Sequence, residues 1–333
     1  IFRRGQKTGD FSREIATDAH ITSATGWRTG VVLDFGTRPD KNPVQMKVGV
    51  SFLDTHRARE LIDREAPGWA FEAHRERAAA AWRDALGRIE IEGADARERR
   101  IFYSALYRLH IMPRDLTGEH PMSRGREPLW TDFYCLWDTF RTLHPLLTLI
   151  QPDKQRDMVR GLLEVYRQTG WLPDAFIAGA HGLVQGGTNG DIVIADAVLK
   201  GLPGIDTKLA WQALTKDADV DSPWPLYYGR ELGDYPTKGY LTTATERSVS
   251  RTLEYAYDDF VIALVGERLG RRAEAATYRR RSRAWEHLWD PETKSVRPRR
   301  PDGTFVSPYD PNAMSFGFEP PYYEGNGRQY ATY

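Results

Sequence analysis

A single carboxylic acid near the C-terminal end of the sequence is the strongest candidate for chemistry. The segment PPYYEGNGRQY (320–330) places Glu324 directly after two tyrosines and before Gly325 and Gly327. A carboxyl group in aromatic surroundings is easier to keep protonated, which a general acid requires. The glycines permit close backbone approach or a positive φ angle. The segment is therefore predicted to carry the acid of an active site, with an ordinary surface turn as the alternative.

A second candidate group lies in DFYCLWDTFRTLHPLL (132–147), which contains Trp137, Asp138 and Arg141. An indole ring can cover the apolar face of a pyranose, while a neighbouring carboxylate accepts hydrogen bonds from two hydroxyl groups. These residue types predict a sugar-binding site. The alternative is structural: Asp138 caps a helix and pairs with Arg141 three residues later.

A glycine-rich segment, QGGTNGDIVIADA (185–197), runs into a predicted helix. Such a loop superficially suggests phosphate binding. However, it lacks the Lys-Ser/Thr pair of a P-loop, and no βαβ unit surrounds it, so a nucleotide site is disfavoured. Gln185, Asn189 and Asp191 are instead predicted to line a pocket rich in hydroxyl groups. Asp196 is expected to be a buried structural partner.

The segment RSVSRTLEYAYDD (247–259) spaces four charged residues along one predicted helix: Arg247, Arg251, Glu254 and Asp258. We interpret them as a ladder of ion pairs along the helix, with pocket lining as the alternative. Metal ligands cannot be predicted from the sequence, because no histidine or carboxylate spacing matches a zinc or EF-hand motif.

Helical periodicity dominates the chain after Trp69. The expected helices cover 69–86, 97–110, 153–168, 190–200, 206–216, 247–269 and 271–289. Ser248 and Gly270 are the expected caps of the 247–269 helix. Long polar loops separate these helices, which is unusual in a compact domain unless the loops carry function. Helices paired across such loops favour an α/α toroid with its site at one end.

The first 55 residues have the character of strands. QMKVGVSF (45–52) alternates apolar and polar residues, as a half-buried strand does, and TGVVLDFG (29–36) is a second candidate. The residue pattern changes from strand-like to helical at EAPGW (65–69), where Pro and Gly precede a helical stretch. We therefore expect a domain boundary here, with one domain at 1–66 and another at 67–333.

The amino-acid composition indicates which kinds of binding partner to expect. The 333 residues include 46 basic and 46 acidic residues, and this neutral balance argues against a nucleic-acid partner. The 10 Trp, 16 Tyr and 13 Phe fit either a large core or a protein that stacks on sugar rings. Cys135 is the only cysteine, which excludes an intrachain disulfide. No apolar run is long enough for a membrane span.

Taken together, the segments resemble glycoside hydrolase family 92, the calcium-dependent exo-acting α-mannosidases. The resemblance covers nearly the whole chain, in order, through VQMKVGVSF, APGWAFEAHRERAAAAWRDALGRIEIEG, FYSALYRLHIMP, LWDTFRTLHPLLTLIQP, GWLPD, GGTNGDIVIADAVLKG, RSVSRTLEYAYDDF, LWDPETKSVRPR and YYEGNGRQY.

The resemblance implies an α+β multidomain fold. Residues 1–66 would be the C-terminal part of an N-terminal β-sandwich, and residues 67–333 an (α/α)6 barrel incomplete at its C-terminus. The general acid would be Glu324, and Asp138 would bind sugar hydroxyl groups. The catalytic base and most calcium ligands would lie in the remaining part of the barrel. The segment alone would then be inactive.

The resemblance also implies an inverting removal of terminal α-linked mannose from oligosaccharides or glycoprotein glycans, with calcium holding two hydroxyl groups of the sugar. A secreted or extracytoplasmic location would follow. One departure stands out: Gly327-Arg328 replaces the Ala-Trp usual in the family motif, which is expected to alter packing behind the acid. The alternatives are another (α/α)6 carbohydrate-active enzyme, such as an inverting glucosidase or a lyase, a member acting on mannose-1-phosphate linkages, and a non-catalytic carbohydrate-binding scaffold.

Overall fold

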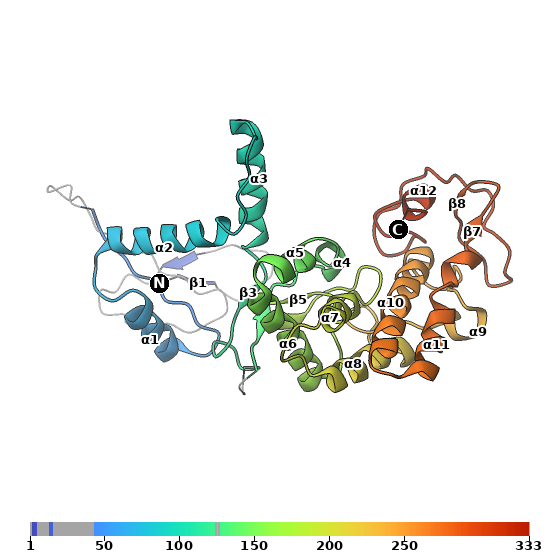
Figure 1. Cartoon of the computed structure of the whole chain (residues 1–333), viewed down its shortest axis with the longest axis horizontal. Helices are drawn as coiled ribbons and strands as arrows, with labels where there is room; N and C mark the ends of the chain where they lie inside the picture. Colours follow the sequence, from blue (N-terminus) through green and yellow to red (C-terminus); the bar gives the residue numbers. More distant parts are fainter. Residues whose placement is uncertain (1, 5–12, 16–42, 124, 126, 333) are drawn as a thin grey trace. The chain divides into compact units, whose positions relative to one another are not determined.

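The computed structural model describes residues 2–4, 13–15, 43–123, 125 and 127–332 (Figure 1). Its helices are α1 (Thr55–Glu65), α2 (Phe71–Leu86), α3 (Ala96–Leu109), α4 (Leu136–Thr139), α5 (Leu143–Ile150), α6 (Pro152–Thr169), α7 (Gly190–Leu199), α8 (Thr207–Asp219), α9 (Tyr235–Lys238), α10 (Ser248–Arg268), α11 (Arg272–Arg281), the 3₁₀ helix η1 (Ala284–His287) and α12 (Gly327–Tyr330). Its strands are β1 (Phe2–Arg4), β2 (Arg13–Ile15), β3 (Arg114–Asp115), β4 (Trp130–Thr131), β5 (Phe176–Ile177), β6 (Ala180–His181), β7 (Trp289–Asp290) and β8 (Ser295–Val296). Within the described residues the fold is thus rich in helices, and the strands form two-stranded antiparallel pairs.

The chain divides into two compact units, residues 1–48 and 49–333. In the first unit, β1 pairs with β2 so that Phe2 lies opposite Ile15. The predicted strand at 29–36 falls outside the described residues. The predicted strand at 45–52 is wrong: these residues form no strand, and Val50 is 73% exposed. Alternation alone does not make a strand, because pairing with a neighbouring strand supplies its stability. The predicted boundary at residue 66 stays a prediction.

In the second unit the predicted helices are largely confirmed, with ends that shift by up to three residues. The exception is the predicted helix at 271–289, since α11 ends at Arg281 and is followed by η1 and β7. The predicted N-cap Ser248 is also wrong: Arg247 occupies that position with φ 52°, and Ser248 is the first helical residue. Gly270, with φ 77°, follows the C-cap Leu269.

The main hydrophobic core lies among α5, α6, α7, α8 and α10. Leu162, Ile194, Leu214 and Ile262 contribute side chains with no exposed surface. The 21 residues of α10 pack against α7, α8 and α11, so this helix runs through the middle of the helical unit (Figure 1). Burial of so many aliphatic side chains supplies the driving force for the helical packing. None of the described helices is both long and apolar enough to cross a bilayer.

Candidate active site

The structure brings the predicted acid and the predicted sugar-binding carboxylate together. Both Asp138 and Glu324 have exposed side chains. Partial burial raises the pKa of Asp138, the nearby charge of Glu324 raises it further, and Arg141 opposes the increase. These three residues, from two distant segments, therefore share one electrostatic environment. Two exposed carboxyl groups can divide the tasks of proton donation and hydroxyl binding.

The backbone at Glu324 is held in an unusual conformation by its neighbours. Glu324 has φ 48°, in the left-handed region that non-glycine residues seldom adopt. The N–H of Tyr323 donates to Ser250 Oγ at 2.9 Å, and the Tyr330 hydroxyl donates to the Tyr323 carbonyl at 2.6 Å. Gly325 pairs with Ser315 through two backbone hydrogen bonds of 2.8 and 3.1 Å. The segment is fixed on both sides, which offsets the cost of the strained φ.

The Gly-Arg departure has a local explanation at Gly327. A Cβ on this residue would lie 2.8 Å from the Val296 carbonyl oxygen and closer still to the Tyr309 hydroxyl. The hydroxyl of Tyr322 donates to the same carbonyl at 2.6 Å. A glycine is therefore required by the approach of β8 and two tyrosines. Asn326 caps α12: its Oδ1 accepts hydrogen bonds from the Arg328 and Gln329 N–H groups, at 3.1 and 3.0 Å.

Helix α4 carries Trp137 and Asp138, yet it has only four residues and no side-chain cap. Its N-cap is Cys135, with φ 47°, so the structural alternative in which Asp138 caps the helix is wrong. Tertiary contacts hold this helix instead. The N–H of Leu136 donates to the Asp174 carbonyl at 2.8 Å, and Trp137 Nε1 donates to Glu254 Oε1. The indole ring meets the Tyr323 ring edge-on, with centroids 5.8 Å apart.

Three residues of the glycine-rich loop were predicted to line a pocket. One of them contacts the Glu324 segment, and the other two are buried. Gln185 Nε2 donates to the Tyr323 hydroxyl at 3.2 Å, beside Glu324. In contrast, Asn189 and Asp191 have no exposed surface. Asp196, predicted to be buried, is instead partly exposed and pairs with Lys200 at 2.9 Å, one turn along α7.

The backbone N–H groups of this loop bind carboxylates of the protein itself. Gly187, Thr188 and Asn189 donate in turn to Glu254, Asp258 and Asp174, each at 3.1 Å. These three carboxylates already occupy the donors that a phosphate would need. The loop is therefore an anchor between helices, and its glycines do not form a phosphate cradle.

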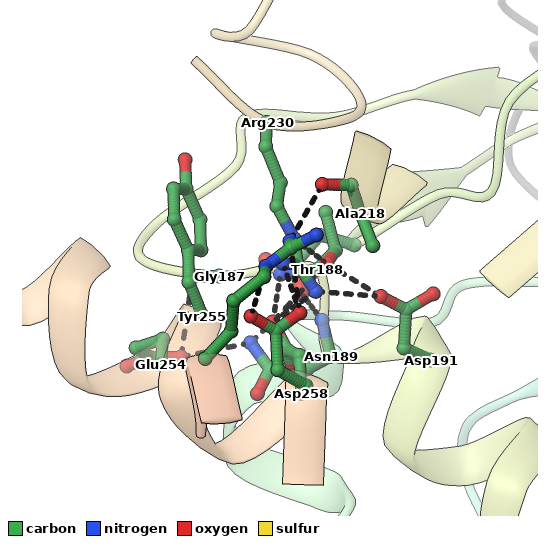
Figure 2. Close-up of polar contacts among 12 residues, drawn as sticks. Gly187, Thr188, Asn189, Asp191, Ala218, Arg230, Glu254, Tyr255 and Asp258 are labelled. Carbon is green, nitrogen blue, oxygen red and sulfur yellow. Dashed lines mark hydrogen bonds and ion pairs between the residues drawn. The ribbon is translucent and has the colours of Figure 1, made fainter. Parts of the chain in front are cut away.

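A network of buried charged side chains surrounds Arg230 (Figure 2). Arg230, with no exposed surface, reaches Asp259 at 2.8 Å, Asp191 at 3.4 Å and Asp258 at 3.7 Å. Arg230 Nε also donates to Thr188 Oγ1 at 3.2 Å. The guanidinium compensates several carboxylates at once, as buried charges require.

Burial is the main cause of raised pKa values in this region. It raises the pKa of Asp174 to about 7 and that of Glu254 to about 8, with the charge of Asp258 adding to both. Hydrogen bonds from Asn189 oppose the increase at both groups. Burial also raises the pKa of Asp258 to about 6, although the charge of Arg230 opposes the increase. The pKa of Asp191 is raised well above its usual range, again mainly by burial.

The predicted ion-pair ladder along α10 is wrong, because its charged residues pair with loops and not with each other. Arg247 Nη1 donates to the carbonyls of Val184 and Gln185 at 2.6 and 2.9 Å. Arg251 pairs with Glu231, while Glu254 and Asp258 accept from the glycine-rich loop. Sequence reasoning missed these roles, although the four-residue spacing along one face was the available signal.

The N-terminus of α10 also holds the segment that carries Glu324. The N–H groups of Arg247 and Val249 donate to the Pro320 and Pro321 carbonyls at 3.1 and 3.0 Å. These donors have no partner inside the helix, so the 320–321 carbonyls satisfy them. One helix therefore contacts α4, the glycine-rich loop and the Glu324 segment.

The calcium ion that the family resemblance implies would need a cluster of oxygen ligands. Across the ranges that the structure describes, no group of three or more His, Cys, Asp and Glu side chains could hold a metal ion. Calcium favours six to eight oxygen ligands. These residues therefore do not fit a calcium site by themselves.

Comparison with known proteins identifies the family. The model of the glycosyl hydrolase family 92 catalytic domain matches residues 57–333. A curated relative, described as an uncharacterized secreted glycosidase of Arthroderma benhamiae, is 34% identical over 297 residues, which cover 85% of this chain and 34% of the relative.

Two solved structures from Bacteroides thetaiotaomicron are also similar. One is a family GH92 inverting mannosidase, with 26% identity and a TM-score of 0.76, covering 83% of this chain and 38% of that one. The other is a family GH92 α-mannosidase in complex with mannoimidazole, with 28% identity and a TM-score of 0.75, covering 85% and 38%. The chain thus spans little more than a third of these proteins. It belongs to glycoside hydrolase family 92.

Proposed function

We propose that the longer protein containing this chain is an inverting α-mannosidase that removes terminal α-linked mannose from oligosaccharides, including N-glycans. The observation that carries this proposal is the pairing of two exposed carboxyl groups, Asp138 and Glu324, on segments far apart in the sequence. Each directly follows one residue of an edge-on aromatic pair: Asp138 follows Trp137, and Glu324 follows Tyr323. An aromatic ring can pack against the apolar face of a pyranose. A nearby carboxyl group can protonate the glycosidic oxygen of that sugar.

In this proposal Glu324 donates a proton to the leaving oxygen, and Asp138 accepts hydrogen bonds from hydroxyl groups of the mannose. Arg141 and Gln185 add polar contacts, and the ring of Trp137 covers an apolar sugar face. For Asn189 and Asp191 we propose support of the loop in place of sugar contact, since both are fully buried. The catalytic base, which activates water in an inverting mechanism, lies on another part of the longer protein.

The proposal extends to architecture and location. Residues 1–66 would end an N-terminal β-sandwich, and residues 67–333 would form part of an (α/α)6 barrel. Calcium would assist by holding sugar hydroxyl groups, with its ligands completed outside the described residues. A secreted or extracytoplasmic location is consistent with the description of the Arthroderma relative.

The test is a comparison of leaving groups in the full-length protein. We expect Glu324→Gln to lower kcat/KM on an unactivated mannose disaccharide by about 10²–10⁴-fold, because proton donation is lost. An aryl α-mannoside with an acidic leaving group needs little protonation and is expected to change far less. Glu319→Gln, which removes an exposed carboxyl five residues earlier, is the matched control. Equal loss on both substrates, or no loss on the disaccharide, would contradict the acid role.

A further inference from the structure

We propose that Glu254 is a positioning residue, which fixes the Trp137 ring against the exposed carboxyl groups. This proposal rests on the proposed function and deepens it. Glu254 lies on α10 and has no exposed surface. Its influence on a bound sugar would therefore pass through the residues that it holds.

One carboxylate joins three segments. Oε1 of Glu254 accepts from Trp137 Nε1 on α4. Oε2 accepts from the Gly187 N–H at 3.1 Å and from Asn189 Nδ2, also at 3.1 Å. Both oxygens of Glu254 are used as acceptors. The carboxylate thereby sets the position of α4 relative to the glycine-rich loop.

The two consecutive glycines of the loop make room for this side chain. A Cβ on Gly186 would lie 2.7 Å from Glu254 Cδ, and one on Gly187 would lie 2.6 Å from Glu254 Cβ. Neither glycine has a positive φ angle. Their role is therefore steric: they allow the loop backbone to approach Glu254 closely. This explains a motif that neither the acid nor the sugar contacts require.

Helix α4 needs such an anchor because four residues cannot form a stable helix alone. Asp138 directly follows Trp137, so movement of the ring would move the carboxylate as well. The ring also contacts Tyr323, the residue before Glu324. Trp137 thus links the two segments that carry the exposed carboxyl groups, and its orientation affects the surface that a sugar would meet.

The experiment is a double-mutant cycle in the full-length protein with Glu254→Gln and Trp137→Phe. Glutamine has one acceptor oxygen, so its amide group turns a donor toward either Trp137 or the loop. Phenylalanine keeps a ring but lacks the N–H donor. We expect each single variant to raise the Ki of mannoimidazole about tenfold, and the double variant to raise it no further. KM for an aryl α-mannoside should rise with Ki, while kcat changes less.

The control is Asp259→Asn, which removes another buried carboxylate of α10, one that binds Arg230 and Arg281. It is expected to lower the thermal midpoint and to leave Ki within twofold. If Glu254→Gln behaves in the same way, or if the two single effects multiply to about a hundredfold, Glu254 is not a positioning residue.

A second readout separates this proposal from the proposed function. The difference in emission between wild type and Trp137→Phe isolates the fluorescence of Trp137. We expect Glu254→Gln to shift that difference spectrum, whether or not the protein hydrolyses a mannoside. Absence of hydrolysis by the wild type would refute the proposed function alone. An unchanged difference spectrum would refute the positioning role.

Discussion

Replacement of Asp217 by Asn is expected to change how stability depends on pH. Asp217 lies on α8 with no exposed surface, and burial raises its pKa to about 8, with Arg230 opposing and Asp258 adding to the increase. The ordinary value is 3.8. Between these two pH values the folded protein binds one more proton than the unfolded chain. The free energy of unfolding therefore falls as pH rises, by about 1.4 kcal/mol per pH unit.

The expected change in the free energy of unfolding can be worked out between pH 5 and pH 7. Between pH 5 and pH 7 this carboxyl is expected to cost the wild type about 2–3 kcal/mol of stability. Asparagine has nearly the shape of the protonated acid and does not titrate. The stability of Asp217→Asn relative to wild type should therefore increase by that amount from pH 5 to pH 7. The charge of Asp217 also raises the pKa of Asp191, so its removal in Asp217→Asn lowers that pKa and acts in the same direction.

The measurement is denaturant unfolding of the full-length protein at pH 5, 6 and 7, with hydrogen exchange of peptides from α8 as a local readout. Asp206→Asn is the control, because Asp206 is an exposed residue that caps the same helix and Asn caps equally well. A constant difference between Asp217→Asn and wild type across this pH range would refute the reasoning. It would mean that Asp217 stays ionised in the fold, compensated by Arg230.

Three further outcomes are expected. Asp138→Asn should lower kcat/KM on α-mannosides about tenfold or more, mainly through KM, because a charged acceptor for sugar hydroxyl groups is lost; Asp153→Asn, at an exposed site on α6, should have no effect on the same assay. Gly187→Ala should destabilise the protein by about 1–3 kcal/mol, since its Cβ would lie 2.6 Å from Glu254 Cβ. Gly201→Ser is the comparison: nothing lies near the added atom there, so its loss of stability reports the cost of a positive φ alone. Removal of calcium by a chelator should abolish mannoside hydrolysis by the full-length protein, with recovery on adding calcium; unchanged hydrolysis would remove calcium from the proposal.

Much of the helical unit could be predicted from the sequence, because its helices have clear apolar faces. The segments around Trp137 and Glu324 were also recognisable, since aromatic and carboxylate residues gather there in short motifs. The residues behind them were not recognisable. Glu254 and Asp258 have local spacing that suggests pairing along one helix, but their hydrogen-bond partners lie 65 to 117 residues away along the chain. Periodicity reports neighbours on a helix and carries no information on such distant partners.

The prediction of a strand at 45–52 was wrong for a related reason. Its alternation describes which side chains would share a face, but a strand also needs a partner strand. Helix α1 was overlooked because its start depends on a single side chain, Asp54, which accepts from the Arg57 N–H at 2.7 Å. Short helices that depend on one cap or on distant contacts leave little trace in hydrophobic periodicity.

The hydrogen bond from Trp137 to Glu254 has a consequence for the order of events during synthesis. Its two residues are 117 positions apart, and Gln185 and Tyr323 are separated by 138. At about 5–20 residues per second, a ribosome needs roughly 6–23 seconds to add the 117 residues that follow Trp137. During that interval the short α4 segment exists without its anchor, although the strands and helices near it can already pack. The surface formed by the α4 and Glu324 segments is therefore completed late, after most of the helical core has left the ribosome.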